Sequence, residues 1–393
     1  MTNEKFIHTK KLKMASFICM GIGLLSFLIA LIRYQHHPER IWANLLLDSV
    51  FFLGISMASA FLIAAVYVAY GGWLTVIKRV PEAISSYIPY AVVFLLIVLV
   101  FGGKYLYEWR NAGYLESDEV LKGKSAYFNP VFYWGRFVFF LGILISLNYL
   151  IRRRSIMEDN AMPGDITHHK KSVDYASLFL IFFAVYISVS SWDWLMSIDV
   201  HWFSTMYGWY VFASFWVTGI SVVALFVIYL RSRGYLKQSN KNHLNMLGIM
   251  MFAFSIFWTY VTFDQFMLIW YANIPEETVY FKERFMHFRF FFYGLWIMNF
   301  VLPFLILISR DAKRKHAVMV IAALIIIFGH FVDFWLMIMP KVVGPSAHLG
   351  WFELSLPLFF IGFFTYMVFN YMSKYNLVPT NHPFLKESIH YEY

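Results

Sequence analysis

Several ionisable residues interrupt long apolar stretches of this sequence, where a charge is costly unless it has a partner. These residues are Asp48, Lys104, Glu108, Arg136, Asp193, Asp264, His287, Arg289, His330, Asp333 and Glu353. All of them fall in the outward-facing half of their segment or at its outer rim, once the chain is oriented, and the inner halves hold almost none. Asp199 and His201 follow in an outer loop that has no lysine or arginine. This placement predicts a polar pocket or a proton-conducting half-channel that opens toward the outer face.

Arg136 needs a partner, because it lies ~9 Å along its helix from the start of its segment. Asp193 or Asp264, at similar depth, could supply the carboxylate. In the same way, Arg289 could pair with Asp333. The alternative is that each arginine extends its side chain to the outer interface and pairs with nothing.

His330 and Asp333 are spaced i, i+3 and therefore share one helix face. An aspartate beside an imidazole makes a proton-accepting couple near neutral pH. Such a couple can take a proton from a bound hydroxyl or pass it along a chain of groups. Asp264, followed by Gln265, is a second candidate. The alternative for both is a satisfied polar contact between helices.

Several kinds of site are excluded or disfavoured. The single cysteine, Cys19, excludes a disulfide framework, an iron–sulfur cluster and a Cys-based zinc site held by this chain alone. A haem held by two histidines is disfavoured, because only His330 lies well inside a segment. No glycine-rich nucleotide motif appears, and no basic stripe or base-stacking motif supports nucleic-acid binding. We therefore expect no metal site, and we interpret His168 and His169 as a solvated pair in an inner loop.

The elements that must position the candidate residues are long apolar helices. The chain has 393 residues, of which 60% are hydrophobic, 21% aromatic and only 14% charged, against about 25% charged in soluble proteins. With a mean hydropathy of +0.60, so much apolar surface requires lipid as its solvent. Ten segments are long enough to span the membrane as helices: 14–32, 45–70, 87–106, 130–151, 173–192, 206–230, 246–271, 285–309, 316–339 and 349–372.

The predicted fold is an all-α integral membrane protein with both termini in the cytoplasm. The loops on the side of the termini carry most of the lysine and arginine, and the clearest runs are residues 152–154 and 310–315. An internal repeat relates the Arg-Phe-rich stretch at Arg136 to that at Arg289, and the stretch around Asp193 to that around Asp333.

This repeat predicts two four-helix bundles related as parallel repeats, with the first and tenth helices flanking them. The divisions are the N-terminus with the first helix, the first bundle, the outer loop with the second bundle, and the tenth helix with a cytoplasmic tail: 1–44, 45–192, 193–339 and 340–393.

Two stretches carry a resemblance to a known family. Residues 191–216, SWDWLMSIDVHWFSTMYGWYVFASFW, and residues 265–278, QFMLIWYANIPEET, resemble the ActF-type membrane subunits of bacterial alternative complex III. Residues 121–136 and 381–388 also fit, so the resemblance spans most of the chain. This family belongs to the NrfD/PsrC-like group of quinol-interacting membrane subunits.

The resemblance implies a subunit of a respiratory quinol:cytochrome c (or other acceptor) oxidoreductase in the bacterial inner membrane. It implies quinol binding near the outer face, proton translocation, or both, with a menaquinone- or ubiquinone-type molecule. Haems and iron–sulfur clusters would be carried by partners, namely multihaem cytochrome c subunits and a large iron–sulfur protein. A paralogous NrfD-like subunit would be the main catalytic one, and a terminal cytochrome oxidase could join the assembly.

Under this hypothesis one polar chain supports quinol oxidation or proton translocation, with candidates also in the outer loops. Its members are Arg136, Asp193, Asp264, Arg289, His330, Asp333 and Glu353, and the outer-loop candidates are Asp199, His201 and His287. Two other functions fit the same residues. A scaffold subunit would use the charges as ties between helices, and a secondary transporter would use the parallel repeats, although few glycines or prolines break the spans near the midplane.

Overall fold

The structure is a computed structural model that describes residues 4–111, 113–114 and 119–392 of the chain. Within these residues it is built of helices, and β-type pairing is limited to one isolated bridge. Ten helices of the described chain are long and apolar enough to cross a membrane. The predicted number of spans is therefore confirmed, and each helix overlaps one of the predicted segments.

Most spans are single helices: α1 (Lys10–Arg33), α2 (Pro38–Val68), α8 (Pro130–Asp159), α9 (Thr167–Trp194), α10 (Tyr207–Ser232), α11 (Lys241–Ala272), α15 (His316–Val343) and α16 (Trp351–Lys374). The third and eighth spans each contain a π-helical turn. The third comprises α3 (Arg79–Ser85), α4 (Ile88–Ile97), the turn Val98–Gly102 and α5 (Gly103–Leu106). The eighth comprises α13 (Arg289–Trp296), the turn Ile297–Val301 and α14 (Leu302–Leu307). Shorter helices are α7 (Glu119–Lys124), α12 (Pro275–His287) and α17 (Leu385–Ile389).

Two spans begin earlier than hydropathy predicts. α2 starts at Pro38 rather than residue 45, and the third span starts at Arg79 rather than residue 87. Arg40 and Arg79 lie in these added turns, and each is buried against a carboxylate. Hydropathy ends a span at such residues because it scores every charge as solvated. It cannot detect a partner that comes from elsewhere in the chain.

The central helices are α2 and α10. α10 contacts α2, α9, α11 and α15, and α2 also contacts α9, α15 and the third span. A Cβ atom at Gly54 of α2 would overlap the Phe215 ring, and one at Gly219 of α10 would overlap Ala58. The two backbones approach closely only because both positions are glycine, as is common between helices in membranes.

The remaining spans surround this pair. α2, α4, α8 and α9 contact one another in a ring, and α10, α11, α14 and α15 do the same. α1 lies at the periphery along α16. Ser16 and Ser26 of α1 form hydroxyl hydrogen bonds with Thr365 and Ser355 of α16.

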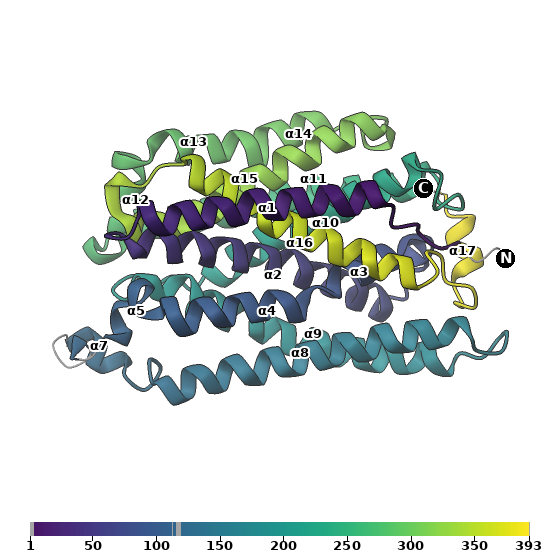
Figure 1. Cartoon of the computed structure of the whole chain (residues 1–393), viewed down its shortest axis with the longest axis horizontal. Coiled ribbons are helices and arrows are strands. Elements are labelled where there is room, and N and C mark those ends of the chain that lie inside the picture. The colour runs from purple at the N-terminus through teal and green to yellow at the C-terminus, as the bar shows by residue number, and fades with distance from the viewer. Residues whose placement is uncertain (1–3, 112, 115–118, 393) are drawn as a thin grey trace.

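Both termini lie at one end of the molecule, with α17, and we call it the N–C end; α5, α7 and α12 lie at the opposite end (Figure 1). An antiparallel bridge pairs Lys5 with Asn376, and the N–H of Leu377 donates to the carbonyl of Glu4 at 2.8 Å. The segment that follows α16 is therefore fixed against the segment that precedes α1.

Candidate functional site

The carboxylate of Asp333 lies at the centre of the most elaborate buried polar site. Asp333 is on α15 and is fully buried. The Tyr210 hydroxyl donates to Oδ1. The Ser214 hydroxyl and the indole N–H of Trp258 both donate to Oδ2, each at 3.0 Å. Residues from three helices, α10, α11 and α15, therefore meet at one carboxyl group.

The local sequence accounts for this arrangement. Tyr210 and Ser214 are spaced i, i+4 and share one face of α10, a helix whose surface is covered by its four neighbours. The three side chains that donate hydrogen bonds to Asp333 are all neutral. No lysine or arginine of the described chain forms an ion pair with it. Its charge, when present, is balanced by dipoles alone.

His330 lies beside this carboxyl group, as its i, i+3 spacing predicts. Its Nδ1 is 3.5 Å from Oδ2 of Asp333, and the residue is fully buried. The ring packs edge-on against the ring of Trp258 at 5.4 Å. Neither ring nitrogen has a hydrogen-bond partner within the described residues. Unpartnered buried nitrogens are rare in native proteins, so an additional partner, such as a water, is expected here.

A small cavity adjoins the Asp333 site toward the opposite end of the molecule. Its volume is about 20 Å³, which is room for about one water. Its lining includes Tyr210, Trp258, Gln265, Tyr280 and Arg284. The buried Oε1 of Gln265 has no partner in the described chain, so it offers a ready acceptor for that water.

Arg284 is the cation nearest to this cavity. It lies on α12, is buried, and places its guanidinium 3.3 Å from the centre of the Tyr280 ring. It donates to the carbonyls of Leu336 and Tyr280, each at 2.7 Å. Burial raises the pKa of the Tyr280 hydroxyl, and the adjacent guanidinium opposes that rise. The hydroxyl therefore stays protonated at neutral pH.

The expected pairing of Arg289 with Asp333 is wrong. The chain turns at Phe288 between α12 and α13, and this turn leaves the Arg289 side chain exposed. Arg289 lines an open apolar groove instead. Arg284, five positions earlier by its number, is the arginine that points inward.

The expected ion pair of Arg136 is confirmed, with Asp193 as its partner. Nε donates to Oδ2 at 2.9 Å and Nη2 to Oδ1 at 2.8 Å, which is a two-pronged contact. The guanidinium also lies 3.9 Å from the centre of the Tyr127 ring and 4.4 Å from that of Phe132. Asp264, the other candidate, is half-buried on α11 and has no hydrogen bond or ion pair with a described residue.

The remaining candidates do not join the Asp333 site. Glu353 accepts from Nε of Arg40 at 2.8 Å and from the Asn44 amide at 3.2 Å, so it ties α16 to α2. Asp199 pairs with Lys341 at 3.3 Å. The two outer histidines, His201 and His287, are exposed.

The spans carry buried charges at the N–C end that lie outside the predicted segments. At the N–C end, five charged residues form a connected and largely buried network: Lys78, Arg79, Glu82, Glu158 and Asp159. The sequence placed these residues in loops, but the third span begins at Arg79 and α8 extends to Asp159. His169, predicted as solvated, is also buried there in the first turn of α9.

Sequence reasoning missed Tyr210, Ser214, Trp258 and Arg284. The first three are neutral, and a search for charges within spans does not detect them. Further buried polar side chains without a partner in the described chain follow toward the N–C end, at Ser255, Asn299 and Asn245. The carbonyl oxygen of Asn299, in a π-helical turn, fills the space left by Gly329, the residue before His330.

The Asp333 site and these unpartnered side chains lie on α10, α11, α15 and the eighth span. In the other ring, α8 and α9 carry the ion pair of Arg136 with Asp193. A comparison with models of known protein families found no match, and a comparison with curated proteins found none either.

Proposed function

We propose that this chain is an integral membrane subunit of a quinol-oxidising respiratory complex of the alternative complex III type, and that its Asp333 site relays protons. The proposed setting is a bacterial inner membrane. The proposed partners are a paralogous membrane subunit, multihaem cytochromes c and a large iron–sulfur protein, with a terminal oxidase as a further neighbour. The family part rests on the resemblance of residues 191–216 and 265–278.

The helix contacts support the proposed architecture of two four-helix bundles with α1 and α16 flanking them. In each ring a helix contacts the next along the chain, and the ring closes between its first and last members. Both termini lie at the N–C end, as an even number of spans requires. The basic runs at 152–154 and 310–315 favour the cytoplasm as the location of that end.

The observation that carries the proposal is a buried carboxyl group with neutral donors next to an unpartnered imidazole. Asp333 can gain or lose a proton without breaking an ion pair, since no arginine or lysine of the described chain pairs with it. His330, 3.5 Å away, has both nitrogens free to take that proton or pass it on. The adjoining cavity has room for the water that would continue the relay.

The cavity favours proton transfer over head-group binding at this position. Its volume of about 20 Å³ is far below the roughly 300–1,000 Å³ of pockets that hold small molecules. A quinol would need another site nearby. The open groove lined by Arg289, Phe291, Phe328 and Val332 has a volume of about 830 Å³ and is mostly apolar.

This groove is our second candidate, for the quinol itself. Val332 lines it and precedes Asp333 in α15. A quinol ring bound there would therefore contact the residue next to Asp333 in the chain. Arg289 at its border offers N–H donors to a quinone oxygen. The quinone would be of the menaquinone or ubiquinone type.

The test is Asp333→Asn in the intact complex, with quinol turnover and proton release measured together. The amide keeps the size of the side chain but cannot take up a proton, so turnover coupled to proton release should fall at least tenfold. Asp264→Asn is the matched control. The structure gives Asp264 no hydrogen bond or ion pair with a described residue, which separates it from the Asp333 site, so the activity of this variant should stay within twofold of the wild type.

Other results would favour the rival functions. Unchanged turnover and proton stoichiometry in Asp333→Asn would refute the relay. Less assembled complex with full activity per complex would favour the scaffold. Solute transport by the purified chain in vesicles would favour a secondary transporter.

A further inference from the structure

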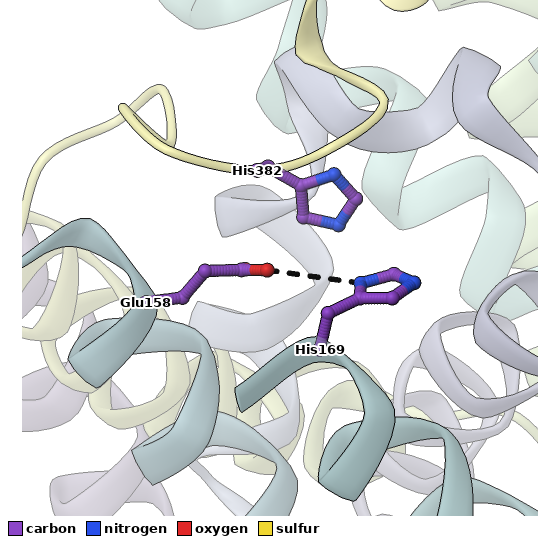
Figure 2. Close-up of side chains that lie close together, drawn as sticks. All are labelled: Glu158, His169 and His382. Atoms are coloured by element: carbon purple, nitrogen blue, oxygen red, sulfur yellow. Dashed lines mark ion pairs between the residues drawn. The ribbon is translucent and has the colours of Figure 1, made fainter. Parts of the chain in front are cut away.

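Three buried side chains converge at the N–C end, far from the proposed relay. Glu158 comes from the last turn of α8, His169 from the first turn of α9, and His382 from the segment between α16 and α17 (Figure 2). Their exposed fractions are 1%, 6% and 7%. One ligand atom from each lies within 4.8 Å of the others. The Nδ1 of His169 is 3.7 Å from Oε1 of Glu158.

Two members of this cluster, Glu158 and His169, lack hydrogen-bond partners within the described residues. Both carboxylate oxygens of Glu158 and both ring nitrogens of His169 are buried without one in the described chain. Lys78 approaches Oε2 of Glu158 at 3.6 Å, which leaves Oε1 directed toward the histidines. Buried polar atoms without partners are costly, so an additional group is expected to satisfy them.

We propose that Glu158, His169 and His382 bind a divalent transition-metal ion of the zinc type. One carboxylate oxygen and two imidazole nitrogens form a common ligand set for Zn²⁺ sites that keep an open fourth position. In a tetrahedral site with bonds of ~2.1 Å, ligand atoms lie roughly 3.4 Å apart. The observed 3.7 Å between His169 and Glu158 needs only a small inward shift.

The state of His382 suits this role. Its burial, together with the nearby Lys78 ammonium, lowers the pKa of the ring, so it is neutral at physiological pH, as a metal ligand must be. Its Nδ1 lies 3.2 Å from the Phe384 N–H and 3.5 Å from the Thr75 hydroxyl. The Phe384 N–H donates to this nitrogen. With a metal on Nε2, the proton would move to Nδ1, the hydrogen bond from Phe384 would be lost, and the Thr75 hydroxyl oxygen would become the acceptor, which is the type of outer contact that orients metal-bound histidines.

The charge balance also favours a cation. The network holds three carboxylates, on Glu82, Glu158 and Asp159, against the cations Lys78 and Arg79. With both imidazoles neutral, its formal charge is negative. Lys78 is already hydrogen-bonded to the Tyr67 hydroxyl at 3.0 Å.

An open groove borders the site. It has a volume of about 510 Å³ and is lined by Tyr70, His169, Lys170, Asp174 and Phe384, among others. It shares His169 and Phe384 with a cavity of about 20 Å³ that includes His382 and Lys78. That cavity has room for about one water, which can serve as the fourth ligand.

The metal would fasten the segment after α16 to the α8–α9 hairpin. That contact already exists in weaker form: the Thr380 N–H donates to Asp159 Oδ1 at 3.2 Å, and the Asn381 amide donates to the carbonyl of Ala161 at 2.7 Å. An ion bound by all three ligands would cross-link segments more than two hundred positions apart by their numbers, which a hydrogen bond achieves only weakly.

The test uses the purified full-length chain in detergent, stripped with a chelator and titrated with Zn²⁺ and separately with Co²⁺. We expect one metal ion per chain, and Co²⁺ absorption typical of a tetrahedral N/O site without a thiolate band. His169→Ala and His382→Ala should each weaken Zn²⁺ binding at least a hundredfold. His168→Ala, the neighbouring control, should bind as the wild type does.

A second readout separates lost binding from misfolding. Zn²⁺ should raise the thermal unfolding temperature of the wild type and of His168→Ala, but not that of His382→Ala. Because His382 lies outside the spans, we expect the His382→Ala variant to keep its transmembrane helices. Wild-type binding no tighter than that of His382→Ala would overturn the proposal. An equal loss of binding in His168→Ala would overturn it as well.

Discussion

Asp193 and Asp333 are two buried aspartates that the predicted repeat makes equivalent, but one is bound by a cation and the other by neutral side chains. Asp193 is held by two hydrogen bonds from the Arg136 guanidinium, and aromatic rings enclose that cation. Asp333 is held by a tyrosine, a serine and a tryptophan. The contacts of the first carboxylate depend on its charge, because its partner is a cation that would otherwise be unpaired. The contacts of the second come from neutral donors and do not require it to be charged.

The difference shows how one framework can combine a fixed tie with an adjustable site. A charge that only joins helices needs an opposite charge at close range. A carboxyl group that must take up and release a proton is better surrounded by dipoles, which stabilise its charged form and also tolerate its neutral form. The predictions below test whether this distinction holds.

The largest expected effect follows from removing the cation of the fixed pair. Arg136→Ala leaves a buried carboxylate alone and should lower the free energy of unfolding by about 3–5 kcal/mol. Denaturant titration of the purified chain in detergent measures the change. The double variant Arg136→Met with Asp193→Leu should recover most of the loss, because no unpaired charge remains. A single-variant loss below ~1 kcal/mol would show that Asp193 is solvated.

The next effect concerns the dipoles around Asp333. Trp258→Phe removes an N–H that donates to the carboxylate, whereas Trp216→Phe removes a buried N–H that has no partner in the described chain. Trp258→Phe should cost about 1.5–3 kcal/mol more than Trp216→Phe if Asp333 is ionised, and about 0.5–1.5 kcal/mol more if it is protonated. The same titration measures both variants. Equal costs would mean that the indole contributes nothing to this site.

A third effect extends the comparison to the N–C end and concerns pH. Burial lowers the pKa of His382, so below the ordinary value of about 6.5 the unfolded chain takes up a proton that the folded chain does not. Stability is therefore complete above that value and falls on acidification, by about 1.4 kcal/mol per pH unit for this one group. The unfolding free energy between pH 7 and 5, with chelator present, measures the slope. His382→Ala should reduce it, while the exposed His390→Ala should not.

The smallest effect concerns Arg289. Its side chain is exposed and forms no ion pair with a described residue, so Arg289→Ala should change the free energy of unfolding by less than about 0.5 kcal/mol. Arg284→Ala is the contrast, because its guanidinium binds two carbonyl groups, and it should cost more than 1 kcal/mol. An equal loss of unfolding free energy in both variants would mean that Arg289 faces inward after all.

The sequence predicts the spans and two of the charged contacts for a clear reason. Apolar length identifies a transmembrane helix without knowledge of its neighbours. Arg136 with Asp193, and His330 with Asp333, could be found because a charge in an apolar stretch needs a partner. Neutral donors such as Tyr210 could not be found this way, since the chain has 26 tyrosines and 14 tryptophans and most tyrosines and tryptophans serve other purposes.

The N–C end could not be predicted, because its burial depends on distant parts of the chain. Glu158 and His169 lie in a predicted loop, between the basic runs 152–154 and 170–171, where charged residues are normally solvated. They become buried only when the segment that contains His382 folds over them. Likewise, the turn at Phe288 decides that Arg284 rather than Arg289 faces inward, and local patterning does not specify the direction of that turn.

The position of α1 has a consequence for the order in which the protein is made. α1 packs mainly along α16 and leaves many apolar side chains, such as Leu25 and Ile32, exposed to lipid. Everything between Arg33 and Trp351 must be synthesised before this partner exists, which at roughly 5–20 residues per second takes tens of seconds. During that interval α1 lacks its partner helix, and the hydroxyls of Ser16 and Ser26 lack their hydrogen bonds to Thr365 and Ser355. α1 thus enters the membrane well before its partner α16, and a stalled ribosome would leave it exposed to non-native helix contacts.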